Sequence, residues 1–224
     1  AGEETITMLT AYDTPTAEVV DEAGIDVVLV GDSVGNAVLG YDSTLPVTVD
    51  EIASHTGAVA RGVEDALVVA DLPFLSFGYD ESKAVENAGR MLKEEGASAV
   101  KIESGEHTVE LTETLTQVGI PVMAHLGLTP QHVNELGGYS RQGTTEEAAE
   151  EMLDLALAHE EAGAFSLVLE HVPANVAAAI TETLSIPTIG IGAGPETDGQ
   201  VLVVNDAVGL SDWSPSFSKQ FGDV

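Results

Sequence analysis

Ala99-Val-Lys-Ile-Glu-Ser104 is an apolar stretch that carries two charged residues near its end. As a β-strand it places Val100 and Ile102 on one face and Lys101 and Glu103 on the other, because side chains alternate along a strand. Burying either charge without a partner costs free energy. Lys101 and Glu103 could form a salt bridge at the strand end, or the strand could run out into solvent there. The alternative is a catalytic site at the end of a parallel sheet, with Lys101 for an anionic substrate and Glu103 for a metal.

The same order of helix, glycine and apolar strand recurs along the chain. Gly24, Gly96, Gly119 and Gly163 each stand before such a strand. Eight nearly continuous apolar runs, typical of parallel sheets covered on both faces, are predicted as strands at residues 5–10, 25–30, 66–70, 99–104, 120–124, 165–169, 186–191 and 201–204. Eight βα units in 224 residues predict an α/β fold, a single-domain (β/α)8 TIM barrel over residues 1–224. A doubly wound open sheet is the alternative, because strand periodicity does not distinguish the two.

Helix-start signals support the segments between these strands. Pro15 suits the first turn of a helix that Gly24 closes, and Asp80 suits an N-cap. Thr144 and Glu147 have the spacing of a capping box for a helix that runs to residue 163. Further helices are expected over about 50–61, 108–118 and 173–184.

Acidic residues dominate the charge of the chain. There are 38 Asp and Glu against 7 Lys and Arg, which gives a net charge of −31. A field of this sign repels nucleic acid and anionic membranes, so neither is expected as a partner. Because the acidic residues fall mainly on helices with apolar spacing, they suit a solvated outer face in a high-salt cytoplasm, where salt screens their repulsion.

Other classes are excluded by composition. The chain has no cysteine, so disulfides, thiolate chemistry and cysteine-based zinc sites are ruled out. We find no signal peptide and no apolar run long enough to span a bilayer, which favours a cytoplasmic protein.

Polar residues follow five of the predicted strands. The carboxyl ends of parallel strands converge on one mouth, where ligands bind. Helix capping accounts well for any one such residue but poorly for a set drawn from five strand ends, namely Asp32, Asp71, Lys101 with Glu103, His125 and Glu170.

The chemistry of this set points to a hard cation. Three carboxylates, Asp32, Asp71 and Glu103, suit Mg²⁺, which prefers oxygen ligands and keeps positions open for water or substrate. Lys101 would balance a substrate carboxylate. Glu170 is equally well explained as a general base across the mouth and as a helix cap before Pro173.

Several weaker signals carry no function of their own. The glycines of 190–194 lack the spacing of a dinucleotide-binding motif. They are better explained by a tight turn between a strand and a helix than by an anion-binding loop. Trp213 and Phe217 are expected to be a packing anchor. Four further histidines are expected to be surface or packing residues, namely His55, His107, His132 and His159.

With these residues in place, the chain resembles the ketopantoate hydroxymethyltransferase family. The resemblance extends from residue 10 to about 221. Eight motifs in order carry it: Leu29-Val-Gly-Asp-Ser33, Asp42-Ser-Thr-Leu-Pro-Val-Thr48, Ala70-Asp-Leu-Pro-Phe74, Val100-Lys-Ile-Glu103, His125-Leu-Gly-Leu-Thr-Pro-Gln131, Gly137-Gly-Tyr139, Leu167-Val-Leu-Glu170 and Ile189-Gly-Ile-Gly-Ala-Gly194.

The resemblance implies a (β/α)8 barrel that transfers a one-carbon unit from 5,10-methylenetetrahydrofolate, or a related carrier, to 3-methyl-2-oxobutanoate. The product would be 2-dehydropantoate, in pantothenate biosynthesis. It further implies a homo-oligomer, often a decamer. The Gly-rich segment 137–143 is expected to be a lid, because a Gly-rich loop over the mouth can exclude water. The implied roles are Mg²⁺ binding by Asp32, Asp71 and Glu103, oxo-acid binding by Asp32, Ser33, Asp71 and Lys101, and proton acceptance by Glu170.

Two rival functions stand beside this one. A Mg²⁺-dependent lyase or mutase of the phosphoenolpyruvate mutase type shares the barrel, but its usual cysteine-containing signature cannot occur in a chain without cysteine. A non-catalytic barrel that binds a small acid is the other. The segments that family members carry before the first strand and after the last one are short here.

Overall fold

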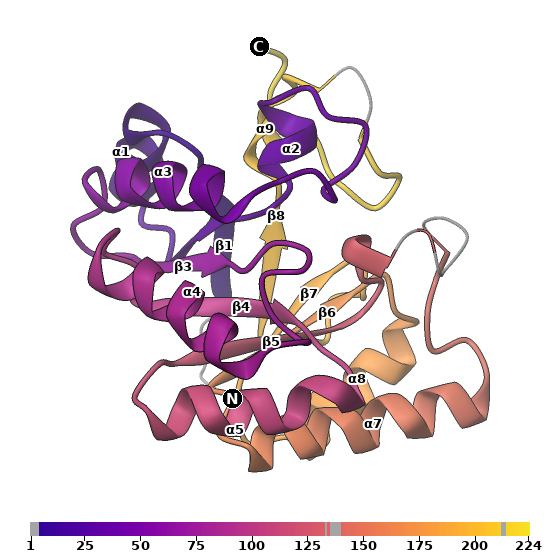
Figure 1. Ribbon diagram of the computed structural model, residues 1–224. Helices are drawn as coiled ribbons and strands as arrows, with labels where there is room; N and C mark the ends of the chain where they lie inside the picture. The colour runs from indigo at the N-terminus through magenta and orange to yellow at the C-terminus, as the bar shows by residue number, and fades with distance from the viewer. Residues whose placement is uncertain (1–4, 133, 135–139, 212–213) are drawn as a thin grey trace.

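The strands of the computed structural model close into a barrel (Figure 1). The structure describes residues 5–132, 134, 140–211 and 214–224. Within this part of the chain each strand pairs in parallel with the next, and the last strand pairs with the first. The predicted (β/α)8 barrel is therefore confirmed, and the open sheet is excluded because an open sheet has two unpaired edges.

The strands and helices lie close to the predicted segments. The strands are β1 Ile6–Thr10, β2 Val27–Val30, β3 Leu67–Asp71, β4 Ala99–Glu103, β5 Val122–Gly127, β6 Ser166–Glu170, β7 Thr188–Ile191 and β8 Gly199–Leu202. The helices are α1 Thr14–Glu22, α2 Val34–Ala37, α3 Val49–Ala60, α4 Glu81–Lys93, α5 Val109–Gln117, α7 Glu146–Glu161, α8 Ala174–Thr183 and α9 Val204–Val208, with 3₁₀ turns η1 Glu106–Thr108 and η2 Pro130–His132.

One predicted helix start is wrong by a residue. The N-cap of α7 is Thr145, not Thr144, and its side chain accepts a hydrogen bond from the N–H of Ala148. The predicted capping box with Glu147 does not form, because with Thr145 as the N-cap the third helical position is Ala148, which has no side-chain acceptor. At α4 the prediction is confirmed, since Asp80 caps the helix by accepting the N–H of Lys83.

The strands separate two apolar layers. Val100 and Ile102 of β4 pack outward with the helices, whereas Ala99 points into the barrel. Lys101 and Glu103 alternate with Val100 and Ile102 and therefore face the interior, as predicted. The layer inside the barrel is an apolar floor made of Met8, Val27, Leu29, Val69, Ala99, Met123, Val168, Ile189 and Val201.

Carboxylates hold loops at the amino end of the barrel. The side chain of Asp21 accepts three backbone N–H groups of residues 64–66, just before β3. Asp26 accepts both the N–H and the hydroxyl of Thr7. Glu160 accepts two N–H groups of residues 185–186, and Asp198 accepts the N–H of Thr188. These contacts join neighbouring βα units without using a basic residue.

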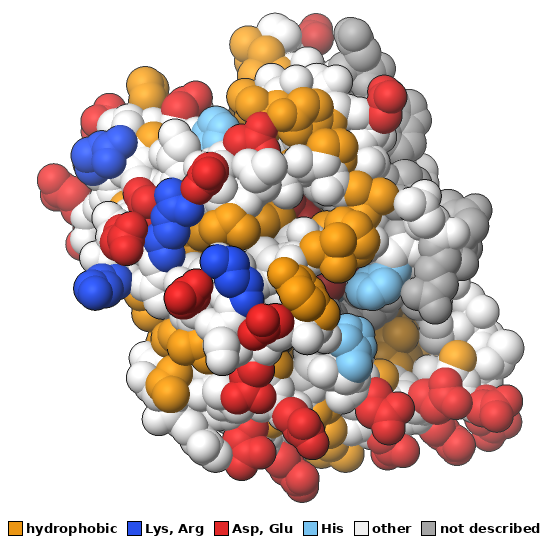
Figure 2. All heavy atoms as spheres, in the orientation of Figure 1, with side chains coloured by type: hydrophobic (Ala, Val, Ile, Leu, Met, Phe, Trp, Pro, Cys, Tyr) orange, Lys and Arg blue, Asp and Glu red, His pale blue; other side chains and the backbone are white. Residues whose placement is uncertain are grey.

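Charge is unevenly distributed on the surface. In Figure 2 the Lys and Arg side chains lie over α3 and α4, whereas Asp and Glu follow the lower edge along α5 and α7. Lys83, Arg90 and Lys93 all belong to α4.

No helix in the described ranges is both long and apolar enough to cross a bilayer.

Candidate active site

A cavity of about 140 Å³ opens at the carboxyl end of the barrel. Its walls include all the charged residues predicted from the strand ends, together with Ser33 and His125. A larger groove of about 430 Å³ lies outside the barrel between α7 and α8. That groove contains none of the buried ionisable groups, so the barrel mouth is the candidate active site.

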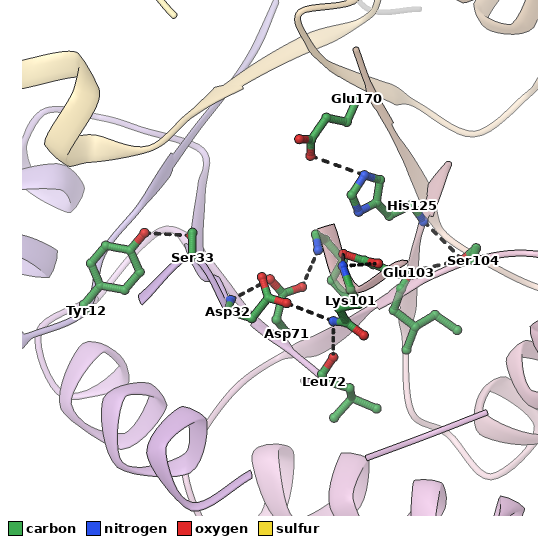
Figure 3. A network of polar contacts seen from close by, with 12 residues as sticks. Tyr12, Asp32, Ser33, Asp71, Leu72, Lys101, Glu103, Ser104, His125 and Glu170 are labelled. Atoms are coloured by element: carbon green, nitrogen blue, oxygen red, sulfur yellow. Dashed lines mark hydrogen bonds and ion pairs between the residues drawn. The ribbon is translucent and has the colours of Figure 1, made fainter. Parts of the chain in front are cut away.

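Lys101 and Asp71 form a buried ion pair in this cavity (Figure 3). The register of β3 and β4 places the two residues side by side, and both are almost fully buried. The other oxygen of Asp71 accepts the backbone N–H of Asp32 at 3.0 Å. The salt bridge considered from sequence therefore exists, but its partner is Asp71 on the neighbouring strand and not Glu103.

Gln131 links the other carboxylates and was not predicted to have a role. Its amide donates to Oδ2 of Asp32 at 2.9 Å and to the carbonyl of Leu72 at 3.0 Å. Its backbone N–H faces the carboxylate of Glu103 at 3.1–3.2 Å. The available signal was its place at the end of the motif that starts at His125, directly after Pro130.

Ser33 is held by Tyr12, a second residue that sequence reasoning missed. The two hydroxyl oxygens are 2.8 Å apart. Burial raises the pKa of Tyr12 above its ordinary value, so the phenol stays protonated and can donate. Tyr12 comes two residues after the end of β1, but a tyrosine beside an apolar strand is also typical of a core residue.

Glu170 lies beside His125, which comes from the neighbouring strand β5. Nε2 of His125 lies 3.4 Å from Oε2 of Glu170, without the alignment of a hydrogen bond. Burial, and then the charge of Lys101, lowers the pKa of His125 well below its usual range, so the ring is neutral. The carbonyl of Glu170 accepts the N–H of Leu128 at 2.8 Å, which ties β6 to the loop after β5.

Tight backbone packing fixes the position of Glu170. Gly127, its partner across the sheet, has a φ of +102°, and a Cβ there would lie 2.2 Å from the Glu170 carbonyl oxygen. The next residue, His171, has a φ of +50°, which a residue with a side chain rarely adopts. Unusual backbone geometry of this kind concentrates at functional sites.

Buried negative charge is in excess in the cavity. Burial raises the pKa of Asp32 to about 8, and the charges of Asp71 and Glu103 add to the effect. Burial likewise raises the pKa of Glu170 to about 8 and raises that of Glu103. Burial alone would lower the pKa of Lys101, but the surrounding carboxylates outweigh it and raise the pKa. Four carboxylates thus share one ammonium group, which favours binding of a cation.

The donor set suits Mg²⁺. No group of three or more His, Asp or Glu side chains in the described part of the chain is already arranged around one metal position. Mg²⁺ in enzymes is usually held by one or two carboxylates, with water and substrate as the other ligands. Asp32 and Asp71 lie together at adjacent strand ends, with Glu103 beside them, so the residues present fit this mode of binding.

The structure also places the remaining sequence candidates. His159 is a packing residue as predicted, with its ring between Thr112 and the carbonyl of Gly105. His132 was expected to be a surface or packing residue, but Nδ1 lies 3.6 Å from Oε2 of Glu103 at the mouth. Phe217 packs as predicted and also lines the cavity. Trp213 and the centre of the proposed lid, residues 137–139, lie outside the described residues.

A closed (β/α)8 barrel with an acidic cluster and one buried lysine at its mouth defines a barrel enzyme that acts on a small anionic molecule. A family model described as ketopantoate hydroxymethyltransferase matches residues 1–224, and the chain belongs to this family.

Relatives named 3-methyl-2-oxobutanoate hydroxymethyltransferase include one from Halobacterium salinarum, which is 76% identical over 219 residues. The match covers 98% of this chain and 80% of the relative. Another, from Haloarcula marismortui, is 70% identical over 224 residues, covering 100% of this chain and 83% of the relative. Both organisms are halophilic archaea.

Among solved structures, phosphonopyruvate hydrolase in complex with oxalate and Mg²⁺ superposes with a TM-score of 0.69. The match covers 92% of this chain and 79% of the hydrolase, at 15% sequence identity. At this identity the likeness concerns the fold alone. The rival lyase or mutase function therefore gains no support beyond the shared barrel.

Proposed function

We propose that this chain transfers a hydroxymethyl group to 3-methyl-2-oxobutanoate and so makes 2-dehydropantoate for pantothenate biosynthesis. The one-carbon donor would be 5,10-methylenetetrahydrofolate or a related carrier. Family membership and the names of the relatives support the reaction. The observation that carries the mechanism is the position of Glu170 opposite the acidic cluster, with a pKa raised to about 8 by burial.

Each side chain at the mouth has a task in this reaction. Lys101 would bind the substrate carboxylate, exchanging part of its contact with Asp71 for the new anion. Ser33, oriented by Tyr12, would donate to the substrate from the opposite side. Glu170 would remove the proton at C3, because a carboxylate with a pKa near 8 is a much stronger base than an ordinary glutamate.

Asp32, Asp71 and Glu103 would hold Mg²⁺. The ion supplies a Lewis acid for the keto oxygen, where negative charge develops as the C3 proton leaves. Gln131 keeps Asp32 and Glu103 in fixed orientations through its side chain and backbone N–H. The homo-oligomeric state and the cytoplasmic location stay predictions.

Deuterium exchange at C3 of 3-methyl-2-oxobutanoate tests this assignment without the one-carbon donor. We expect Mg²⁺-dependent exchange in molar KCl, and formation of 2-dehydropantoate once the donor is added. Glu170→Gln should still bind Mg²⁺ and the oxo acid but lose exchange by about 10²–10⁴-fold, the usual contribution of a general base.

Glu161→Gln is the matched control, since Glu161 is the exposed last residue of α7, lies before the amino end of β6 and does not line the cavity. It should exchange at the wild-type rate. Normal exchange in the Glu170→Gln variant would remove Glu170 from the role of base. A wild-type protein that binds the acid without exchange or transfer would instead indicate the non-catalytic barrel.

A further inference from the structure

The mouth of the barrel has two chemically different halves. The charged residues of the site come from the ends of β2 to β6. The wall beside β7 and β8 is mostly apolar, with Asp206 of α9 as its acidic residue among those described, and consists of Ile191, Val201, Leu202, Val203, Pro215 and Phe217. Two of these side chains, Pro215 and Phe217, belong to the segment after the barrel.

Glu170 stands at the boundary between the two halves. Its neighbour across the sheet on one side is Ile191, the last residue of β7. On the other side lies β5, which carries His125. A bound molecule that contacts both halves therefore presents the middle of its length to the carboxylate of Glu170.

Phe217 is held in place by contacts with two residues that directly follow different strands, Gly192 after β7 and His171 after β6. Its ring lies against Gly192, where an added Cβ would be 2.8 Å from Cγ of the ring. The other contact is the ring of His171, with centroids 5.3 Å apart at an interplanar angle of 38°. Phe217 is thus a fixed part of the wall and not a loose surface side chain.

The proposed substrate has the same two-part chemistry. In 3-methyl-2-oxobutanoate the carboxylate and keto oxygens form one end, and an isopropyl group forms the other. The C3–H bond lies where the two ends meet. With the oxygens toward the charged half, the alkyl group would face the apolar wall and the C3 proton would face Glu170.

We propose that Phe217 determines substrate specificity by packing against the branched alkyl group of the oxo acid. This inference rests on the proposed function and adds the residue that selects among 2-oxo acids. A single methyl group in an apolar pocket changes kcat/KM by about 10–200-fold, so one ring that contacts both methyl groups is sufficient for clear discrimination.

The test compares C3 exchange of 3-methyl-2-oxobutanoate with that of 2-oxobutanoate, which has one methyl group fewer. The measured quantity is the ratio of the two kcat/KM values, in Mg²⁺ and molar KCl. Phe217→Ala should lower this ratio by about 10-fold or more, mainly through a higher KM for the branched acid. Phe217→Leu, which keeps an apolar side chain, should restore most of the ratio.

Phe221→Ala is the matched control. Phe221 belongs to the same segment, is exposed, and does not line the cavity. Its replacement should leave the ratio unchanged. An unchanged ratio in Phe217→Ala would overturn the inference, because a merely structural role lowers kcat/KM for both substrates by the same factor. An equal fall of the ratio in Phe221→Ala would also overturn it.

Circular dichroism shows whether Phe217→Ala is folded. If it is not folded, Phe217→Trp replaces it in the test. The larger ring should exclude the branched acid more strongly than the linear one and so lower the ratio of their kcat/KM values. An unchanged ratio in Phe217→Trp would then overturn the inference. Wild-type protein that exchanges neither acid would refute the proposed function, which is a different outcome from exchange with an unchanged ratio.

Discussion

Lys101→Met should destabilise the protein, and more so at high pH than at low pH. Lys101 is buried and is the ammonium group that the four carboxylates of the cavity share. Removing one partner of a buried ion pair typically costs about 3–5 kcal/mol, because the other charge stays buried without compensation. Lys101 also lowers the pKa values of Asp32, Glu103 and Glu170, so its loss raises all three.

The sign of the pH effect follows from these directions. A carboxyl group whose pKa is raised by folding binds its proton more tightly in the folded state, so stability falls as pH rises toward the folded pKa. At about pH 5.5 Asp32 and Glu170 are protonated, and the missing cation matters mainly to Asp71. At about pH 8.5 both groups are mostly ionised in the wild-type protein, because their pKa values are about 8, but stay protonated in the variant. This difference adds up to about 0.8 kcal/mol of destabilisation for each group.

Urea unfolding at the two pH values, in molar KCl with a chelator present, measures the difference. The free energy of unfolding should fall by about 3–5 kcal/mol at the lower pH and by about 1–2 kcal/mol more at the higher one. Lys93→Met is the matched control, since Lys93 is exposed at the end of α4 and should have little effect at either pH. Losses of the same size at both pH values would refute the shared-ammonium explanation.

Two further predictions concern the backbone and the surface. Gly127→Ala should lose exchange activity and should lose more stability than Gly119→Ala. Both glycines have a positive φ, so the backbone strain of an alanine is shared. An added Cβ at Gly127 would lie 2.2 Å from the Glu170 carbonyl oxygen, whereas one at Gly119 would meet nothing within 4 Å. Equal losses in thermal unfolding and in exchange would contradict this. Dilution from molar KCl to about 0.05 M should lower the midpoint of thermal unfolding, because the Debye length grows from roughly 3 Å to beyond 10 Å and the net charge of −31 is no longer screened. An unchanged midpoint would dismiss adaptation to salt.

The architecture was largely predictable, because each strand is a separate apolar run and four of the runs follow a glycine that ends a helix. The alternation within Ala99–Glu103 gave the correct faces of β4. Closure of the barrel was not predictable from periodicity, since it depends on pairing between β1 and β8, residues 6–9 with 199–202. The number of βα units in a chain of this length favoured the barrel over the open sheet, and the family resemblance implied the same fold.

The site was predictable as a set of residues but not as a network of contacts. Strand ends converge in any parallel sheet, which is why Asp32, Asp71 and Glu170 could be grouped. The partner of Lys101 depends on the register between β3 and β4, and spacing along one strand does not specify that register. Gln131 was missed for a similar reason, because an uncharged amide in a loop carries no signal until its neighbours are known.

Phe217 shows a different limit of sequence reasoning. Its aromatic side chain near the end of the chain was correctly expected to pack. The side it presents to the cavity depends on Gly192, which lacks the Cβ that would displace the ring. Contacts between segments this far apart in sequence are set by the closed barrel as a whole.

The carboxylates at the amino end of the barrel explain how so acidic a chain can still fasten its loops. Asp21 and Asp26 bind backbone N–H groups, and these bonds lower the pKa values of both side chains. Peptide N–H groups are supplied by nearly every residue, so the surface can lose lysine and arginine through evolution without loosening these connections. These connections therefore resist high salt but are lost in acid, since protonation of a carboxylate removes the hydrogen-bond acceptor while salt leaves it intact.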